Sequence, residues 1–103
     1  MIRVIATIQL RAGCRNAFLK VLKALVPQVR QEPGCRDYEP MVDLPTNFTA
    51  QVPVRGDVIT IVEQWDSLDA LEAHLIAPHM LEYRKAVKGF VADVTLQVLQ
   101  AAE

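Results

Sequence analysis

Residues suited to proton transfer and to aromatic binding gather in one segment of the 103-residue chain, between positions 63 and 84. Both histidines of the sequence, His74 and His79, lie in this segment on either side of Pro78. Because a histidine titrates near neutral pH, either one could take a proton from a phenol-like hydroxyl group. Trp65 offers a flat apolar wall for an aromatic ring. The segment predicts an apolar pocket with a proton acceptor near its rim.

Four further side chains complete the candidate site. Tyr83 and Arg84 lie in the helix that follows the histidines, where they could hold a substrate oxygen. Glu63 precedes the tryptophan by two residues and could orient a histidine, and Met41 could fill space in the pocket. Trp65 and the histidines also have structural interpretations, since a tryptophan at a strand end is usually a core residue and a helical histidine is often a surface or capping residue.

The sequence leaves open which histidine is the base. His79 directly follows Pro78, so helix N-terminal N–H groups would disfavour its charged form, which favours it slightly over His74. The pattern Glu72-x-His74 with His79 also raises the question of a metal site. No third ligand occurs at zinc-like spacing and the proline breaks the helix face, so no metal site is predicted.

The elements that must position these residues follow from hydrophobic periodicity. Strands are expected at residues 2–10, 35–43, 57–65 and 91–99, a helix at 14–32, and two further helical segments on either side of Pro78. Asp66-Ser67 supplies the expected N-cap of the first of these segments, and Pro40 places its strand at a sheet edge or a bulge. The stretch 44–56 is expected to be a long loop, of the kind that forms a lid or contact arm.

This order, β-α-β-β-α-β, predicts a single domain over residues 1–103 with a ferredoxin-like α+β fold and an antiparallel sheet. A strand with one solvated face should alternate between apolar and polar residues. The first and third predicted strands do not, since Ile5 opposes Val4 and Val62 opposes Ile61. The sheet face away from the helices therefore needs a cover, and a second copy of the chain would supply it, which predicts a homodimer.

The composition argues against two classes of binding partner. Eleven basic and twelve acidic residues give a net charge of −1, without a basic run, which argues against binding to nucleic acid or an anionic membrane. The N-terminus lacks the features of a signal peptide, and no apolar stretch approaches the ~20 residues that span a bilayer. A cytoplasmic location is expected.

Several short runs resemble the antibiotic biosynthesis monooxygenase superfamily, and most closely its bacterial quinol monooxygenase branch. They are Glu63-Gln64-Trp65, Leu71-Glu72-Ala73-His74-Leu75, Pro78-His79-Met80, Val4-Ile5-Ala6 and Pro40-Met41-Val42-Asp43. The resemblance spans nearly the whole chain and weakens mainly in the 44–56 stretch. It implies a ferredoxin-like protomer whose sheets pack face to face in a dimeric α/β barrel.

The resemblance also implies an activity: oxidation of a quinol-type aromatic substrate by O2, without flavin, haem or metal. Haem-degrading relatives carry an Asn and a haem-ligating His where this chain has Thr7 and, by alignment, Arg84, so haem degradation is not expected. Two alternatives remain, a dimeric module that binds a small molecule or a partner without catalysis, and an isomerase of small phosphorylated sugars. The isomerase would need a stronger anion site than the sequence displays.

Overall fold

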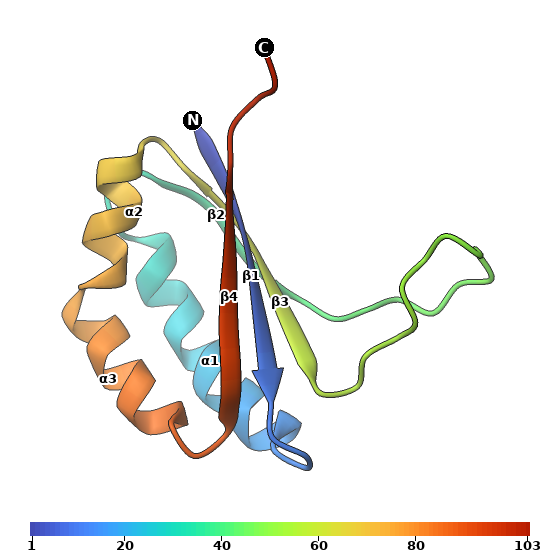
Figure 1. Cartoon of the computed structure of the whole chain (residues 1–103). Helices are drawn as coiled ribbons and strands as arrows, with labels where there is room; N and C mark the ends of the chain where they lie inside the picture. Colours follow the sequence, from blue (N-terminus) through green and yellow to red (C-terminus); the bar gives the residue numbers. More distant parts are fainter.

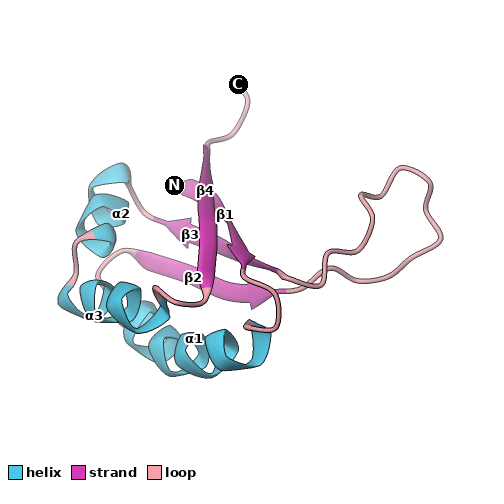
Figure 2. Ribbon diagram, turned by 60° about the horizontal axis from the view of Figure 1, so that its bottom comes forward, coloured by secondary structure: helices cyan, strands magenta, loops and turns pink.

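A computed structural model describes all 103 residues. Its elements are β1 (Ile2–Leu10), α1 (Arg15–Arg30), β2 (Cys35–Met41), β3 (Val58–Trp65), α2 (Leu68–Leu75), α3 (Pro78–Val87) and β4 (Val91–Leu99). The four strands form one antiparallel sheet in the order β2-β3-β1-β4, and all three helices cover the same face of it (Figures 1 and 2). The predicted ferredoxin-like α+β fold is confirmed, with element bounds that differ from expectation by two residues at most.

The core lies between the sheet and the helices. On β1 the side chains of Val4, Ala6 and Ile8 are buried against the helices, while Ile5 and Thr7 on the opposite face are only half-buried. This alternation follows from the two-residue period of a strand. The helices contribute the apolar residues that close the core, among them Phe18, Leu22, Val29, Leu71, Met80 and Val87.

β2 is an edge strand, as Pro40 predicted. A proline cannot donate a hydrogen bond to a neighbouring strand, so it is tolerated where one side of the strand is unpaired. The strand also contains an irregularity between Cys35 and Asp37, and it ends at Met41, opposite Thr60. The predicted end at residue 43 was two residues too late.

The connection between α1 and β2 packs closely against α2. Gly34 adopts a left-handed conformation with φ +82°, and a Cβ atom at this position would lie 2.7 Å from Cβ of Ala70. Only glycine combines this conformation with so close an approach. The tight turn brings the residues just before it, including Glu32, against the junction of α2 and α3.

Local sequence signals set that junction. The side chain of Ser67 accepts a hydrogen bond from the backbone N–H of Ala70, which confirms the N-cap predicted at Asp66-Ser67 and assigns it to Ser67. Pro78 occupies the first position of α3, where its missing N–H carries no penalty. α2 therefore stops at Leu75 and α3 starts in a new direction three residues later.

The sheet of the chain is open and does not close into a barrel (Figure 1). Residues 42–57 leave the sheet as a long arm that projects away from the helices and does not fold back over the sheet (Figures 1 and 2). Asp43 and Arg55 pair at the base of this arm, with Arg55 Nε 2.8 Å from Asp43 Oδ2. None of the three helices is both long and apolar enough to pass through a membrane.

Candidate functional site

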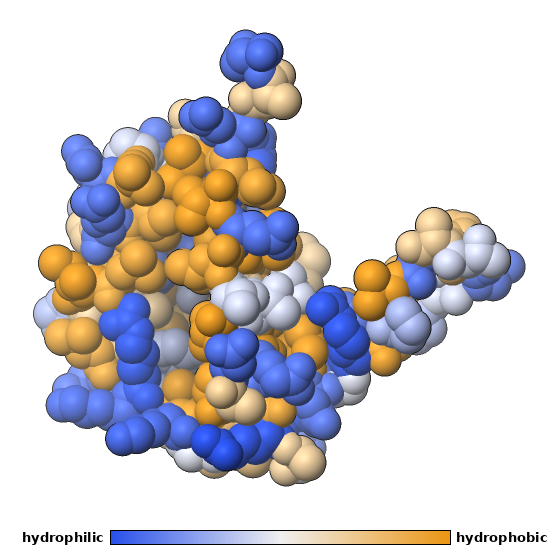
Figure 3. All heavy atoms as spheres, viewed as in Figure 1, coloured by the Kyte–Doolittle hydropathy of each residue, from blue (hydrophilic) through white to orange (hydrophobic).

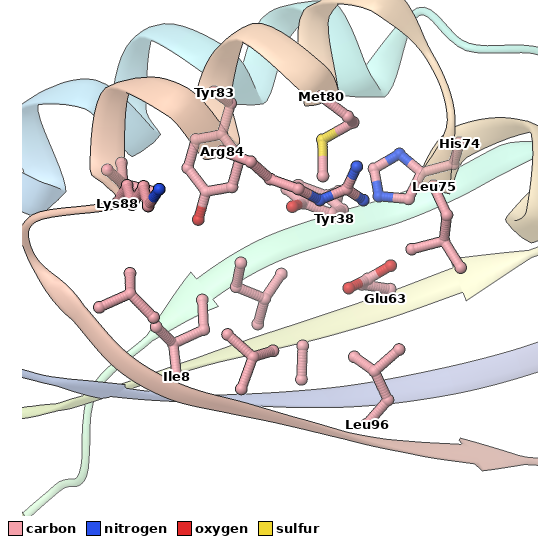
Figure 4. Close-up of a pocket in the computed structure, with 15 residues that line it drawn as sticks. Ile8, Tyr38, Glu63, His74, Leu75, Met80, Tyr83, Arg84, Lys88 and Leu96 are labelled. Atoms are coloured by element: carbon pink, nitrogen blue, oxygen red, sulfur yellow. The ribbon is translucent and has the colours of Figure 1, made fainter.

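A cavity of about 410 Å³ lies between the helix-covered face of the sheet and the helices α2 and α3 (Figure 4). Its volume is within the range of sites for small organic ligands. Most of its wall is apolar, with Ala6, Ile8, Ile61, Leu75, Met80, Val87, Val91, Val94 and Leu96, and its polar residues are Tyr38, Glu63, His74, Tyr83, Arg84 and Lys88. The predicted apolar pocket thus has a counterpart in the structure.

Glu63 is buried in the floor of the cavity. It points from β3 toward the helices, two residues from Trp65 and on the same face of the strand, and Trp65 Nε1–H donates a hydrogen bond of 2.9 Å to Glu63 Oε1. Burial raises the pKa of Glu63 to about 7, against the opposing effect of the bond from Trp65, and the nearby charge of Glu32 raises it further. Glu63 can therefore hold or release a proton near neutral pH.

His74 points from α2 into the opposite side of the cavity (Figure 4). Its side chain is 2% exposed, and its Nδ1 lies 2.9 Å from Glu32 Oε2. The ring packs against Trp65 with centroids 4.7 Å apart and against the edge of Tyr38 at 5.6 Å. Burial lowers the pKa of His74, although the Glu32 carboxylate opposes this effect. A neutral imidazole that donates from Nδ1 keeps its lone pair on Nε2, the nitrogen left for a ligand in the cavity.

His79 lies outside this cavity. It lines a separate open groove between α1 and α3, its side chain is 23% exposed, and its Nε2 is 2.7 Å from the same Glu32 oxygen. The preference for His79 over His74 as the base therefore has no geometric support, because His79 lies in the groove beside α1 and not in the cavity.

Two other predicted positions need correction. Trp65 is 0% exposed and is not part of the cavity wall, so no substrate ring can stack on it without a rearrangement of the core. Met41 is 47% exposed at the end of β2 and does not reach the cavity. Glu63 does not contact either histidine through a hydrogen bond; the residue that orients both is Glu32.

Sequence reasoning missed Glu32, which was interpreted only as part of the end of the first helix. The contacts with His74 and His79 span 42 and 47 residues. No local pattern signals such a contact, which arises from the tight turn at Gly34 and the packing of that turn on α2.

The other predicted residues, Tyr83 and Arg84, do line the cavity, together with Lys88 directly after the end of α3. Figure 4 shows the guanidinium group of Arg84 beside the ring of His74, and its positive charge contributes to the lowered pKa of that histidine. Burial raises the pKa of Tyr83 to about 12, so its hydroxyl group is a hydrogen-bond donor at neutral pH. This wall of the cavity can hold an anionic oxygen.

The structure contains no group of three or more His, Cys, Asp and Glu side chains arranged to hold a metal ion. Glu72, part of the metal pattern considered from the sequence, is exposed on α2. A reaction that needs no metal stays a prediction.

The raised pKa of Glu63 predicts a pH-dependent stability. A folded-state pKa of about 7, above 4.5 for the free group, means that the folded protein keeps a proton which the unfolded chain has lost. The free energy of unfolding should therefore fall, relative to Glu63→Gln, as the pH rises from about 4.5 to about 7, by on the order of 3 kcal/mol. Urea denaturation of both proteins at several pH values measures the difference. Because both proteins contain His74, the effect of its titration cancels in the comparison.

Glu72→Gln, at an exposed position on α2, is the matched control; it retains Glu63, so its difference in stability from the wild type should stay constant over this pH range. A constant difference between wild type and Glu63→Gln across this pH range would contradict a proton held by Glu63.

Comparison with known proteins adds an independent line of information. Residues 1–86 match the profile of the family described as "Antibiotic biosynthesis monooxygenase". The chain is 43% identical over 102 residues to "Probable quinol monooxygenase YgiN" of Escherichia coli K12, with 97% of each chain covered. Two solved structures share the fold. The structure of Rv0793 from Mycobacterium tuberculosis has a TM-score of 0.80 and 28% identity, with 99% of this chain and 95% of that one covered. The crystal structure of PA3566 from Pseudomonas aeruginosa has a TM-score of 0.81 and 26% identity, with coverage of 99% and 94%.

Proposed function

Because the chain belongs to the antibiotic biosynthesis monooxygenase family, we propose that it oxidises a quinol-type aromatic substrate with O2 and without a bound cofactor. The observation that carries the proposal is the apolar cavity with the buried imidazole of His74 at its wall, held by Glu32 through Nδ1. The quinol monooxygenase name of the Escherichia coli relative supports the choice of substrate class.

The first step is binding and deprotonation. The apolar residues of the sheet and of α3 enclose the ring, and its hydroxyl group lies toward His74. Nε2 of His74 accepts the hydroxyl proton, and the positive charge of Arg84 stabilises the phenolate that forms. A general base placed in this way contributes typically ~10²–10⁴-fold to the rate.

The second step is the reaction with O2. A deprotonated quinol is a far better electron donor than the neutral ring, so the protein does not need a flavin or a metal to start the transfer. Its task is to hold the anion and O2 together and to keep water away from the reduced oxygen species. Apolar side chains of Ile8, Ile61 and Met80 in the cavity wall suit this task.

A second candidate function has one observation in its favour. Arg84 of α3 and Lys88 at its C-cap, four residues later, give the cavity a cationic wall, which is a stronger anion site than the sequence alone displayed. Isomerisation of a small phosphorylated sugar would use that wall for the phosphate and the Glu63 and His74 side chains for proton transfer. The remaining alternative, a module that binds a small molecule without catalysis, has less support, because His74 lines the cavity and does not face solvent.

Oxygen uptake tests the proposal. Protein treated with a chelator and dialysed should consume O2 with at least one member of a panel of naphthoquinols and benzoquinols, at rates above the buffer and heat-treated protein. Retention of O2 uptake after chelation is the expected result. Absence of uptake over the whole panel, together with turnover of a phosphorylated sugar, would replace the proposal by the second candidate.

We also propose that the protein is a homodimer through the helix-free face of the sheet. The centre of this face carries uncharged side chains, with Ile5 paired to Val62 and Thr7 paired to Thr60, and the 42–57 arm leaves it uncovered (Figure 1). Sedimentation velocity at micromolar concentration should give twice the mass of the 11.5-kDa chain. Ile5→Glu, at the centre of the face, should shift the protein to monomer, whereas Gln9→Glu near the strand end should not. A wild-type monomer would contradict the proposal.

A further inference from the structure

One carboxylate connects the two histidines across the layer of helices. Glu32 Oε2 lies 2.9 Å from Nδ1 of His74 and 2.7 Å from Nε2 of His79. The side chain of His74 is 2% exposed and that of Glu32 10%, whereas the side chain of His79 is 23% exposed. The three residues therefore form a continuous path from the cavity at His74 to the open groove between α1 and α3 at His79.

The distribution of charge in this trio follows from burial. A single buried carboxylate is neutralised by one imidazolium, and a second positive charge beside it would be uncompensated. Desolvation disfavours a charge on the more deeply buried ring, so of the two rings it is His79, which reaches solvent, that can carry a positive charge beside Glu32. His74 is then the neutral partner, with its Nε2 lone pair available in the cavity.

Other polar groups surround the trio. His74 faces Tyr38 of β2, Glu63 of β3 and Arg84 of α3, while His79 shares its groove with Gln28, Glu82 and Tyr83. Glu32 is the one carboxylate hydrogen-bonded to either ring.

We infer that Glu32 and His79 are positioning residues that couple proton uptake by His74 in the cavity to proton release by His79 in the outer groove. The inference deepens the proposed function and rests on it for the source of the proton. When the substrate O–H bond breaks, its proton goes to Nε2 of His74; His79 releases the proton on Nδ1 to water, and Glu32 now neutralises His74. The trio carries the same net charge before and after this exchange. When His74 gives its proton to reduced oxygen, His79 takes up a proton from water, and the resting arrangement returns.

A purely structural role for the same contacts must be separated from this one. Glu32 also ties the α1–β2 turn to the α2–α3 junction, so its loss would weaken packing there. Loss of activity in a Glu32 variant is therefore not informative alone. The titration of His74 is informative, because coupling moves it in opposite directions when the carboxylate or the neighbouring imidazolium is removed, whereas loosened packing does not.

The experiment is an NMR titration of the two histidine side chains, which needs no substrate. Removal of positive charge in His79→Ala should raise the titration midpoint of His74, and removal of negative charge in Glu32→Gln should lower it, each by on the order of one pH unit. His79→Gln and Glu32→Asn serve as second variants if either protein is unstable. Gln28→Ala, in the same outer groove, is the matched control and should leave the midpoint unchanged.

The kinetic counterpart uses the pH profile of kcat/KM for O2 uptake. Its acidic limb should move up in His79→Ala and down in Glu32→Gln, and added imidazole should restore the wild-type limb in His79→Ala, because the groove there is open. Shifts of the His74 midpoint in the same direction in both variants, or no shift, would overturn the coupling. Opposite NMR shifts without O2 uptake by the wild type would instead retain the coupling and reject the proposed oxidation.

Discussion

His74→Ala should lower kcat for quinol oxidation by ~10²–10⁴-fold while the protein remains folded. The imidazole is the group that lines the cavity, is neutral because burial lowers its pKa, and is fixed through Nδ1 by Glu32. Removal leaves no other base of that kind at the same wall. Steady-state O2 uptake measures the change, with circular dichroism and sedimentation to verify fold and assembly.

Two further variants test whether the basic nitrogen of His74 is responsible for this loss. His74→Gln retains much of the volume and a donor for Glu32 but has no basic nitrogen, so it should lose as much activity as His74→Ala. Glu72→Ala, two residues away on the exposed side of α2, should keep wild-type activity. Wild-type turnover in both His74 variants would remove His74 from the role of base, although the cavity itself would still be a candidate site.

The second large effect is on stability. Trp65→Ala should lower the free energy of unfolding by about 3–5 kcal/mol, which is the usual cost of truncating a large buried aromatic residue. Trp65 is 0% exposed, packs on His74 and donates its indole N–H to Glu63. Urea denaturation followed by circular dichroism is the suitable measurement, because Trp65 is the only tryptophan of the chain and the variant loses its fluorescence.

Trp65→Phe separates the two contributions. It retains most of the apolar volume but leaves the buried carboxyl group of Glu63 without its donor, at a cost of about 1–3 kcal/mol. The pKa of Glu63 should rise further in this variant, because the bond from Trp65 opposes the effect of burial. If Trp65→Ala changed only the KM for the quinol and not the stability, Trp65 would be the stacking surface expected from the sequence, and its buried position would be contradicted.

The fold was predictable because its elements are specified by local sequence patterns. The period-two pattern of β1 placed Val4, Ala6 and Ile8 on one face, and Ser67 and Pro78 marked the starts of α2 and α3. Each of these signals acts within a few residues, so it does not depend on tertiary structure.

The site was predictable only in part, since its geometry depends on contacts between distant segments. Glu63, His74, Tyr83 and Arg84 were brought together as expected. Glu32 was missed because nothing near it in the sequence indicates a partner more than 40 residues away. Proximity in sequence was misleading for His79, which lies five residues after His74 but belongs to a helix that starts in a new direction.

The role of Trp65 was predicted wrongly for a different reason. Its position two residues after Glu63 on one strand was visible in the sequence, and a period-two strand puts both side chains on the same face. Which of the two reaches a cavity depends on the helices above them. The ring of His74 covers Trp65, and the cavity begins beside it at Glu63.

A blocked cavity mouth gives the most direct test that the quinol is oxidised in the cavity between the sheet and α2–α3. Val94 and Val98 lie on the same face of β4, paired with Ile8 and Val4, and are 51% and 49% exposed. Figure 3 shows apolar side chains along this side of the molecule, beside α2 and α3. Val94 lines the cavity and Val98 does not.

The measurement is O2 uptake with the best quinol of the panel for Val94→Trp and Val98→Trp. Val94→Trp, with its ring in the cavity mouth, should lose at least ten-fold in kcat/KM, because a bulky side chain there excludes the substrate. Val98→Trp adds the same apolar bulk outside the cavity and should stay near the wild-type value. Equal activities in the two variants would contradict oxidation in this cavity.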